Sequence, residues 1–218
     1  MIRFRHTMEK EIENYFKVMQ SINDPNMQPK IYYQIKEIKL DPESKKEVSN
    51  YFKDLASKKA KIIKTKLEIY KKDWRKIEKE FFARTDKFFE TKTTMGNLTA
   101  YLTFTDRCGY NIEDEYFFLT MDRDNSNAGI IHEVLHFYTH KLIQPIFDNG
   151  NIDYAKFNAF KETLTFVINY IYGDLLDGFC EKGYKIHRKV IKYLESKYKI
   201  GVKAEDLADI YINKFCTK

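Results

Sequence analysis

The chain has 218 residues, of which 43% are hydrophobic and 16% aromatic, and this composition excludes a disordered chain. The length suits one large domain, or a domain with a helical extension, that folds around its own core. The net charge of +6 comes from lysines interleaved with glutamates along predicted helices. That pattern indicates solvated helix faces, so we do not expect nucleic acid as a partner.

The sequence contains no run of eighteen apolar residues that could span a bilayer. Its first six residues lead directly into charged sequence, without the apolar segment of a secretory signal. The three cysteines are an odd number and lie far apart, which favours reduced thiols over a disulfide framework. We therefore expect a cytoplasmic protein with no membrane segment. The sequence does not indicate an oligomeric state.

Residues 1–96 are predicted to form a helical N-terminal region that packs on the rest of the chain. Residues 7–22 have the apolar spacing of a helix, and residues 30–40 are rich in strand formers. Asp41 and Pro42 then have the features of a helix start. Apolar residues between positions 48 and 81 recur at alternating intervals of three and four, which predicts one or two long helices. For the lysine-rich run within these helices, the alternative to a solvated helix face is a nucleic-acid-binding patch.

Residues 97–218 are predicted to form the functional region, in one compact domain with the first part. Residues 98–105 alternate between apolar and polar side chains, and residues 115–121 supply a second run of strand formers. We expect these two strands to pair as an antiparallel hairpin that leads into a helix ending before Pro145. The predicted fold class is therefore α+β, predominantly helical, with a small antiparallel sheet packed on that helix.

The helix that ends before Pro145 contains the pattern His-Glu-x-x-His at residues 132–136. On a helix, His132 and His136 lie one turn apart on one face, so both imidazoles can reach one tetrahedral Zn²⁺. Glu133 lies beside them, where a carboxylate can act as a base toward the water that the metal activates. The alternative is a pair of histidines on an ordinary amphipathic helix.

A catalytic zinc ion needs a third protein ligand, and the next predicted helix offers one. That helix is apolar over most of its circumference but carries a polar row at helical spacing, formed by Asn158, Glu162, Thr165 and Asn169. Glu162 lies twenty-six residues beyond His136, which leaves room for a reverse loop and an antiparallel return. A metal would stabilise a carboxylate in such a buried row. Asp148 and Asp153 are the fallback ligands, and a surface salt bridge of Glu162 is the alternative.

A strand pair, a helix with His132, Glu133 and His136, and a glutamate on a following helix resemble the gluzincin branch of the HExxH zincin metallopeptidases. This branch includes thermolysin, and the closer resemblance is to its small single-domain bacterial members. The resemblance covers about residues 98–176. It implies a zincin-like fold in which His132, His136 and Glu162 bind zinc and Glu133 is the catalytic general base.

The chain departs from the gluzincin pattern at Phe166, where members of the branch commonly have an acidic residue that orients a zinc histidine. Thr165, Asn169 or a backbone carbonyl would have to take that role. An oxyanion stabiliser is not fixed by the sequence. The candidates for it, each with a purely structural alternative, are Tyr110, Tyr184 and His187. His140, one turn beyond His136, is expected near the substrate, beside a ligand or in the core.

Together these features predict a cytoplasmic zinc-dependent hydrolase, a metallopeptidase that acts on a peptide or protein substrate. The alternative is a non-catalytic, zinc-stabilised binding module that engages a protein or nucleic-acid partner. Glu133 discriminates between them, because a structural zinc site does not need a carboxylate beside an open coordination position. Neither the substrate nor the cleavage specificity follows from the sequence.

Overall fold

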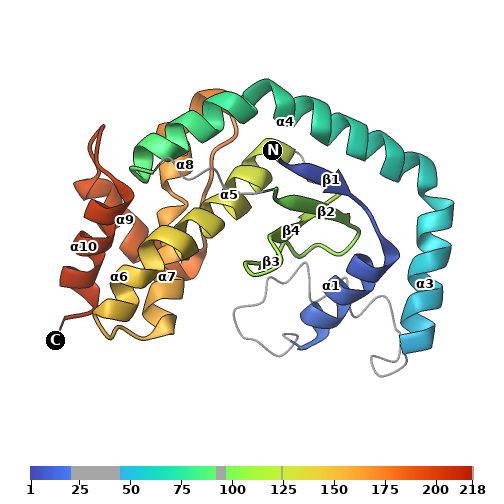
Figure 1. Ribbon diagram of the computed structural model, residues 1–218, viewed down its shortest axis with the longest axis horizontal. Coiled ribbons are helices and arrows are strands. Elements are labelled where there is room, and N and C mark those ends of the chain that lie inside the picture. The colour runs from blue at the N-terminus through green and yellow to red at the C-terminus, as the bar shows by residue number, and fades with distance from the viewer. Residues whose placement is uncertain (21–44, 92–96, 124, 218) are drawn as a thin grey trace. The chain divides into compact units, whose positions relative to one another are not determined.

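The computed structural model describes residues 1–20, 45–91, 97–123 and 125–217 (Figure 1). Its strands are β1 (Arg3–Arg5), β2 (Thr99–Thr103), β3 (Tyr110–Asn111) and β4 (Tyr116–Thr120). Its α-helices are α1 (Met8–Gln20), α3 (Lys45–Lys58), α4 (Ala60–Phe88), α5 (Ser126–Tyr138), α6 (Gln144–Asn149), α7 (Tyr154–Leu164), α8 (Val167–Ile171), α9 (Arg188–Lys197) and α10 (Ala204–Phe215). The strand predicted at residues 30–40 and the helix start predicted at Asp41 and Pro42 lie outside the described residues.

The chain forms two compact units. The first unit comprises Met1–Trp74 and Gly96–Ser126, and the second comprises Arg75–Met95 and Asn127–Lys218. Helix α4 contributes its first half to the first unit and its second half to the second. These bounds differ from a division at residue 96, because strands β2 to β4 group with α1 and not with the helices that follow them. Among the described residues, no helix combines the length and apolar character that a bilayer crossing requires.

The first unit contains a mixed four-stranded sheet in the order β1-β2-β4-β3. Strands β1 and β2 run parallel, and so do β2 and β4, in which Thr99 pairs with Tyr116. Only β3 runs antiparallel to its neighbour β4. The fold is therefore α+β and mainly helical, but the predicted antiparallel hairpin between residues 98–105 and 115–121 is wrong.

The reversal of the chain occurs later than the sequence predicted, at the turn between β3 and β4. The Asn111 side chain accepts a hydrogen bond from the Asp114 backbone N–H (2.9 Å) and donates one to the Asp114 carboxylate (3.0 Å). Glu115 completes the turn with a φ of 52°. Alternation of apolar residues defines the faces of a strand but not its direction, so it could not reveal this topology.

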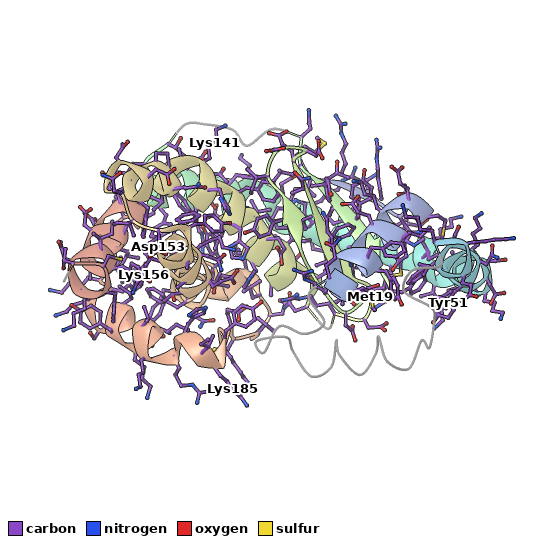
Figure 2. The ribbon with its side chains drawn as sticks, turned by 90° about the horizontal axis from the view of Figure 1, so that it is seen from below. Met19, Tyr51, Lys141, Asp153, Lys156 and Lys185 are labelled. Atoms are coloured by element: carbon purple, nitrogen blue, oxygen red, sulfur yellow. The ribbon has the colours of Figure 1, made fainter. Side chains whose placement is uncertain are left out.

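Helix α1 packs against the sheet and against α3 through an aromatic cluster. Its buried members are Tyr15, Val18, Val48 and Phe52. Met19 on α1 and Tyr51 on α3, both labelled in Figure 2, are partly buried and pack against this cluster. The cluster therefore joins the first helix to α3 within the first unit.

A polar contact also fixes α1 to the sheet, and it makes the stability of the first unit depend on pH. The Glu13 carboxylate accepts hydrogen bonds from Lys10, Lys17 and Tyr116. Burial alone would raise the pKa of Glu13, but these three partners outweigh it and lower the pKa to about 2 from an ordinary value of 4.5. A depressed pKa stabilises the fold above pH 4.5, and this contribution is lost as the pH falls toward 2.

We therefore expect Glu13→Gln to destabilise the protein by about 1 to 2 kcal/mol at pH 6, after allowance for solvent screening of this partly exposed group. The difference from the wild type should shrink steadily below pH 4.5 and vanish near pH 2. Urea denaturation at several pH values measures it. Glu9→Gln, an exposed change on the same helix, is the control and should give no such slope. A difference that stays constant with pH would contradict the expectation.

Helix α5 enters the second unit at Asn127, and all of its residues from Ser126 to Tyr138 are buried. A helix that is covered on every side belongs to the interior. The ladder continues past the predicted end at Gln144, through a π-helical turn, Thr139–Ile143, into α6. Here the Gln144 backbone N–H donates to the Thr139 carbonyl, five residues earlier. The wider turn interrupts the regular ladder before Pro145, which then occupies the first turn of α6, where its missing N–H is not needed.

Helices α6 and α7 are joined by a short reverse loop, as the sequence predicted. Asn151 in this loop adopts a φ of 51°. Asp153 caps α7, its side chain accepting from the Lys156 backbone N–H (2.9 Å), and both residues are labelled at this end of the helix in Figure 2. Helix α7 contacts α6 and α9, and α10 contacts α9 (Figure 1). The return of α7 along the unit is what brings its polar row back toward α5.

Candidate metal centre

Helix α5 presents His132 and His136 on one face, as the four-residue spacing predicts. Their ring centroids are 4.7 Å apart, and the rings are inclined by 82°. His132 is 9% exposed, His136 2% and the neighbouring Glu133 5%. Three polar side chains in the interior of the unit require partners from other elements, because unpaired burial is costly.

The partner of both histidines is Glu162 on α7. Its Oε2 atom lies 3.8 Å from Nε2 of His132 and 3.6 Å from Nε2 of His136. In the part of the chain that the structure describes, these three residues form the only group of His, Cys, Asp and Glu whose ligand atoms all lie within 4.8 Å of one another. Zinc bonds of 2.0 to 2.1 Å in a tetrahedral site imply ligand separations of about 3.3 Å, so a small adjustment would suffice.

The Oε2 atom of Glu162 supplies a test of whether a cation fits this position. It is buried, and it has no hydrogen-bond partner among the described residues. A buried carboxylate oxygen that accepts no hydrogen bond is costly, and a cation at this position would compensate it. Two imidazole nitrogens and one carboxylate oxygen are the ligand types of catalytic zinc sites. The residues present therefore fit a zinc ion held by His132, His136 and Glu162.

The other oxygen of Glu162 is bound by a residue that the sequence did not reveal. Lys161 donates from Nζ to Glu162 Oε1 at 2.6 Å, and its side chain is only 2% exposed. Neighbouring residues on a helix do not share a face, so helical spacing gives no signal for this pair. The contact depends on the side-chain conformation of the buried lysine, which helical spacing does not predict.

A second unpredicted residue, Glu181, approaches the far side of His132. Its Oε2 lies 3.6 Å from Nδ1 of His132, within ion-pair distance and slightly beyond a normal hydrogen bond. A carboxylate in this position fixes the ring orientation and leaves Nε2 for the metal. Glu181 lies in the segment between α8 and α9, and Phe166 packs against Tyr170 and Tyr198.

Asn169 holds Glu181 in place. Its side chain donates to the Glu181 carbonyl (2.8 Å) and accepts from the Glu181 backbone N–H (2.7 Å). The Gly183 N–H donates to the Glu181 carboxylate (2.9 Å). Gly183 has a φ of +60°, and a Cβ there would lie 2.6 Å from Cδ1 of Ile191, so glycine is required. The polar row was predicted on one helix, but the helix ends at Leu164, so Glu162 lies on α7 and Asn169 on α8. The row still contains a metal-ligand candidate and the residue that anchors Glu181.

The charges around the two histidines act in opposite directions. Burial favours the neutral form of His132, but contact with Glu181 and the charges of Glu133 and Glu162 outweigh it and raise the pKa of His132. Burial lowers the pKa of His136 well below its usual value, and the positive charge of Lys161 contributes. His136 is therefore held neutral, which is the form that binds a metal.

The remaining predicted residues have other surroundings. His140 makes a 2.8 Å hydrogen bond between Nδ1 and Gln144 and packs on Phe157, which agrees with a packing role. Thr165 donates to the Glu162 carbonyl at the end of α7. Tyr110 belongs to β3 in the first unit. Of the fallback ligands, Asp148 is exposed and Asp153 caps α7.

Tyr184 and His187 lie together on the 3₁₀ turn before α9, with ring centroids 6.3 Å apart. This turn contacts α7, the helix that carries Glu162. Burial lowers the pKa of His187, an effect partly offset by the charge of Glu162. The charge of Glu162 therefore reaches His187, and both residues stay candidates for the oxyanion stabiliser.

We expect Glu181→Ala to weaken zinc binding by roughly ten- to hundredfold, the usual consequence of removing a carboxylate behind a metal-binding histidine. Glu181→Gln should weaken it less, because a side chain of the same size still lies beside the ring, although its charge is lost. Competition with a chromophoric chelator measures the affinity. Glu205→Ala, an exposed change in the first turn of α10, is the control. Equal affinities for Glu181→Ala and the wild type would show that Glu181 does not orient His132.

Comparison of the chain with protein-family models, with curated proteins and with solved structures finds no match. The function must therefore be inferred from the geometry of this site.

Proposed function

We propose that this protein is a zinc-dependent hydrolase, a metallopeptidase of zincin-like fold that cleaves peptide bonds. The observation that carries the proposal is the single buried oxygen of Glu162 facing Nε2 of both His132 and His136. With Glu133 adjacent to His132, the four residues supply the ligands and the base that zinc-dependent hydrolysis requires.

Each residue has a distinct part in the proposed reaction. His132, His136 and Glu162 would hold the ion, which when bound lowers the pKa of water and polarises the substrate carbonyl. Glu133 would accept the proton of the attacking water and return it to the leaving amine. His132 is steered by Glu181, and Glu162 is held by Lys161. The burial of these groups strengthens their electrostatic interactions and limits their motion.

The second candidate is a non-catalytic zinc-stabilised binding module. A structural zinc site usually takes four protein ligands, whereas the cluster found among the described residues offers three. Three ligands leave one position open for water or substrate. Glu133, buried next to His132 in the sequence and acting on its charge, favours a hydrolase, because a purely structural site has no use for a base.

Two measurements test the proposal. Metal analysis of the purified full-length chain should find about one zinc ion per chain. A peptide-library assay should then detect cleavage that stops on treatment with a chelator and returns on addition of zinc. Bound zinc without any cleavage would favour the binding module, and absence of zinc after incubation with the ion would refute both candidates.

A further inference from the structure

We propose that Lys161 is a positioning residue that restricts Glu162 to one metal-binding oxygen and lowers the zinc affinity of the site, so that the ion is exchangeable. This inference rests on the proposed metal centre. It adds a property that the ligand set alone would not give, because a lysine beside a metal-binding carboxylate opposes the ion that the carboxylate attracts.

Because of the contact with Lys161, the two carboxylate oxygens of Glu162 have different surroundings. Oε1 accepts from the ammonium at 2.6 Å, a distance typical of a strong charge-assisted hydrogen bond. Oε2 faces the two imidazoles. Binding of an ion through both oxygens would require Oε1 to leave Lys161, which would cost a buried ion pair. The ion should therefore be bound through Oε2 alone.

The positive charge of the Lys161 ammonium group acts on a histidine of the site and on others near it. Its side chain is 2% exposed, so water screens it little. Its charge acts on His136, His140 and His187. A fixed positive charge in this place repels a divalent cation bound by His136 and Glu162. Repulsion of this kind lowers the affinity without changing a single ligand.

Lys161 also stabilises the protein before any ion arrives. In the metal-free chain its ammonium compensates part of the buried charge of Glu162. A carboxylate that already has a paired cation is stabilised less by a metal than an unpaired carboxylate would be. The binding of the metal is therefore weaker by this difference in free energy. The pairing of Lys161 with Glu162 thus both holds the carboxylate in place before the ion binds and weakens the affinity of the site for zinc.

A merely structural lysine would behave differently on replacement. Its loss would destabilise the metal-free and zinc-bound forms alike and would leave the affinity unchanged or reduced. The proposed role predicts the opposite sign for affinity. Lys161→Met should lower the stability of the metal-free form and tighten zinc binding, since both the repulsion and the competing ion pair disappear.

The experiment compares zinc dissociation constants of the full chain by chelator competition at fixed pH and salt. Lys161→Met and Lys161→Gln should each bind zinc roughly tenfold more tightly, or more, than the wild type. Lys192→Met, which removes the same charge from an exposed position on α9, should stay within about twofold of the wild type. The rise in melting temperature on addition of zinc should be larger for Lys161→Met than for the wild type.

Lys161→Gln provides the test if Lys161→Met does not fold, because its amide can still donate to Oε1. X-ray absorption of the zinc-loaded wild type needs no variant and should show a carboxylate bound through one oxygen. Unchanged or weaker affinity in a folded variant, or a carboxylate bound through both oxygens, would overturn the inference while the metal centre stands. A wild-type chain that binds no zinc would overturn the proposed function as well.

Discussion

Replacement of Glu133 by glutamine is expected to lower peptide hydrolysis by roughly 10² to 10⁴-fold while the chain keeps its zinc. Glutamine has the size of glutamate but cannot accept the proton of the attacking water. Glu133 is buried, and its charge contributes to the raised pKa of His132. It does not belong to the group of candidate ligands. The loss should therefore appear in turnover, whereas metal content and melting temperature should change little.

Three measurements on Glu133→Gln separate these effects: zinc per chain, melting temperature, and kcat/KM on a substrate found by library cleavage. Glu195→Gln on α9 is the matched control, since it makes the same chemical change on a helix that carries none of the ligands. Unchanged turnover in Glu133→Gln would rule out the general-base mechanism. Loss of zinc together with turnover would instead place Glu133 among the ligands.

Glu162→Ala is expected to reduce zinc affinity by more than the roughly ten- to hundredfold that follows loss of a residue behind a ligand. The change removes one of three candidate ligands outright. It also leaves the buried Lys161 without the carboxylate that accepts its hydrogen bond, so the metal-free form should lose stability as well. Glu162→Gln retains an acceptor for Lys161 and separates the two effects, because it should lose affinity but less stability.

Asp148→Ala is the matched control for Glu162, since Asp148 was the other acidic candidate near the same loop and is exposed. Titration of both variants with zinc, followed by chelator competition, gives the comparison. Full zinc occupancy in Glu162→Ala, or marked loss in Asp148→Ala, would show that the third ligand is not Glu162.

The part of the site that could be predicted from the sequence is the part fixed by helical spacing. His132 and His136 share a face because they are four residues apart. The return of Glu162 was foreseen because a polar row on an apolar helix needs a buried partner and a reverse loop precedes it. Lys161 and Glu181 were missed for a common reason, since their contacts depend on how a side chain bends and where a loop lies. Neither property has a periodic signal.

In the fold, too, the features that follow a periodic sequence pattern could be predicted, and those that depend on the path of a loop could not. The helices from residue 45 to residue 88 follow their apolar spacing closely. The sheet does not follow the expectation, because the direction of β4 depends on where the chain turns, and the Asn111 turn lies after a long loop. Strand β1 is three residues long and pairs with β2, which lies more than ninety residues later in the chain, so the local sequence pattern does not reveal it.

The π-helical turn after α5 has a consequence for the spacing of the three histidines. His132, His136 and His140 recur every four residues, and in a uniform α-helix all three would lie along one face. A wider turn begins at Thr139, and His140 within it contacts Gln144 and Phe157 and does not belong to the group of His132, His136 and Glu162. Beyond His136, the π-helical turn contacts α10, and α6 contacts α7. One backbone irregularity thus separates the segment that carries the two candidate metal-binding histidines from the segment that packs against α10.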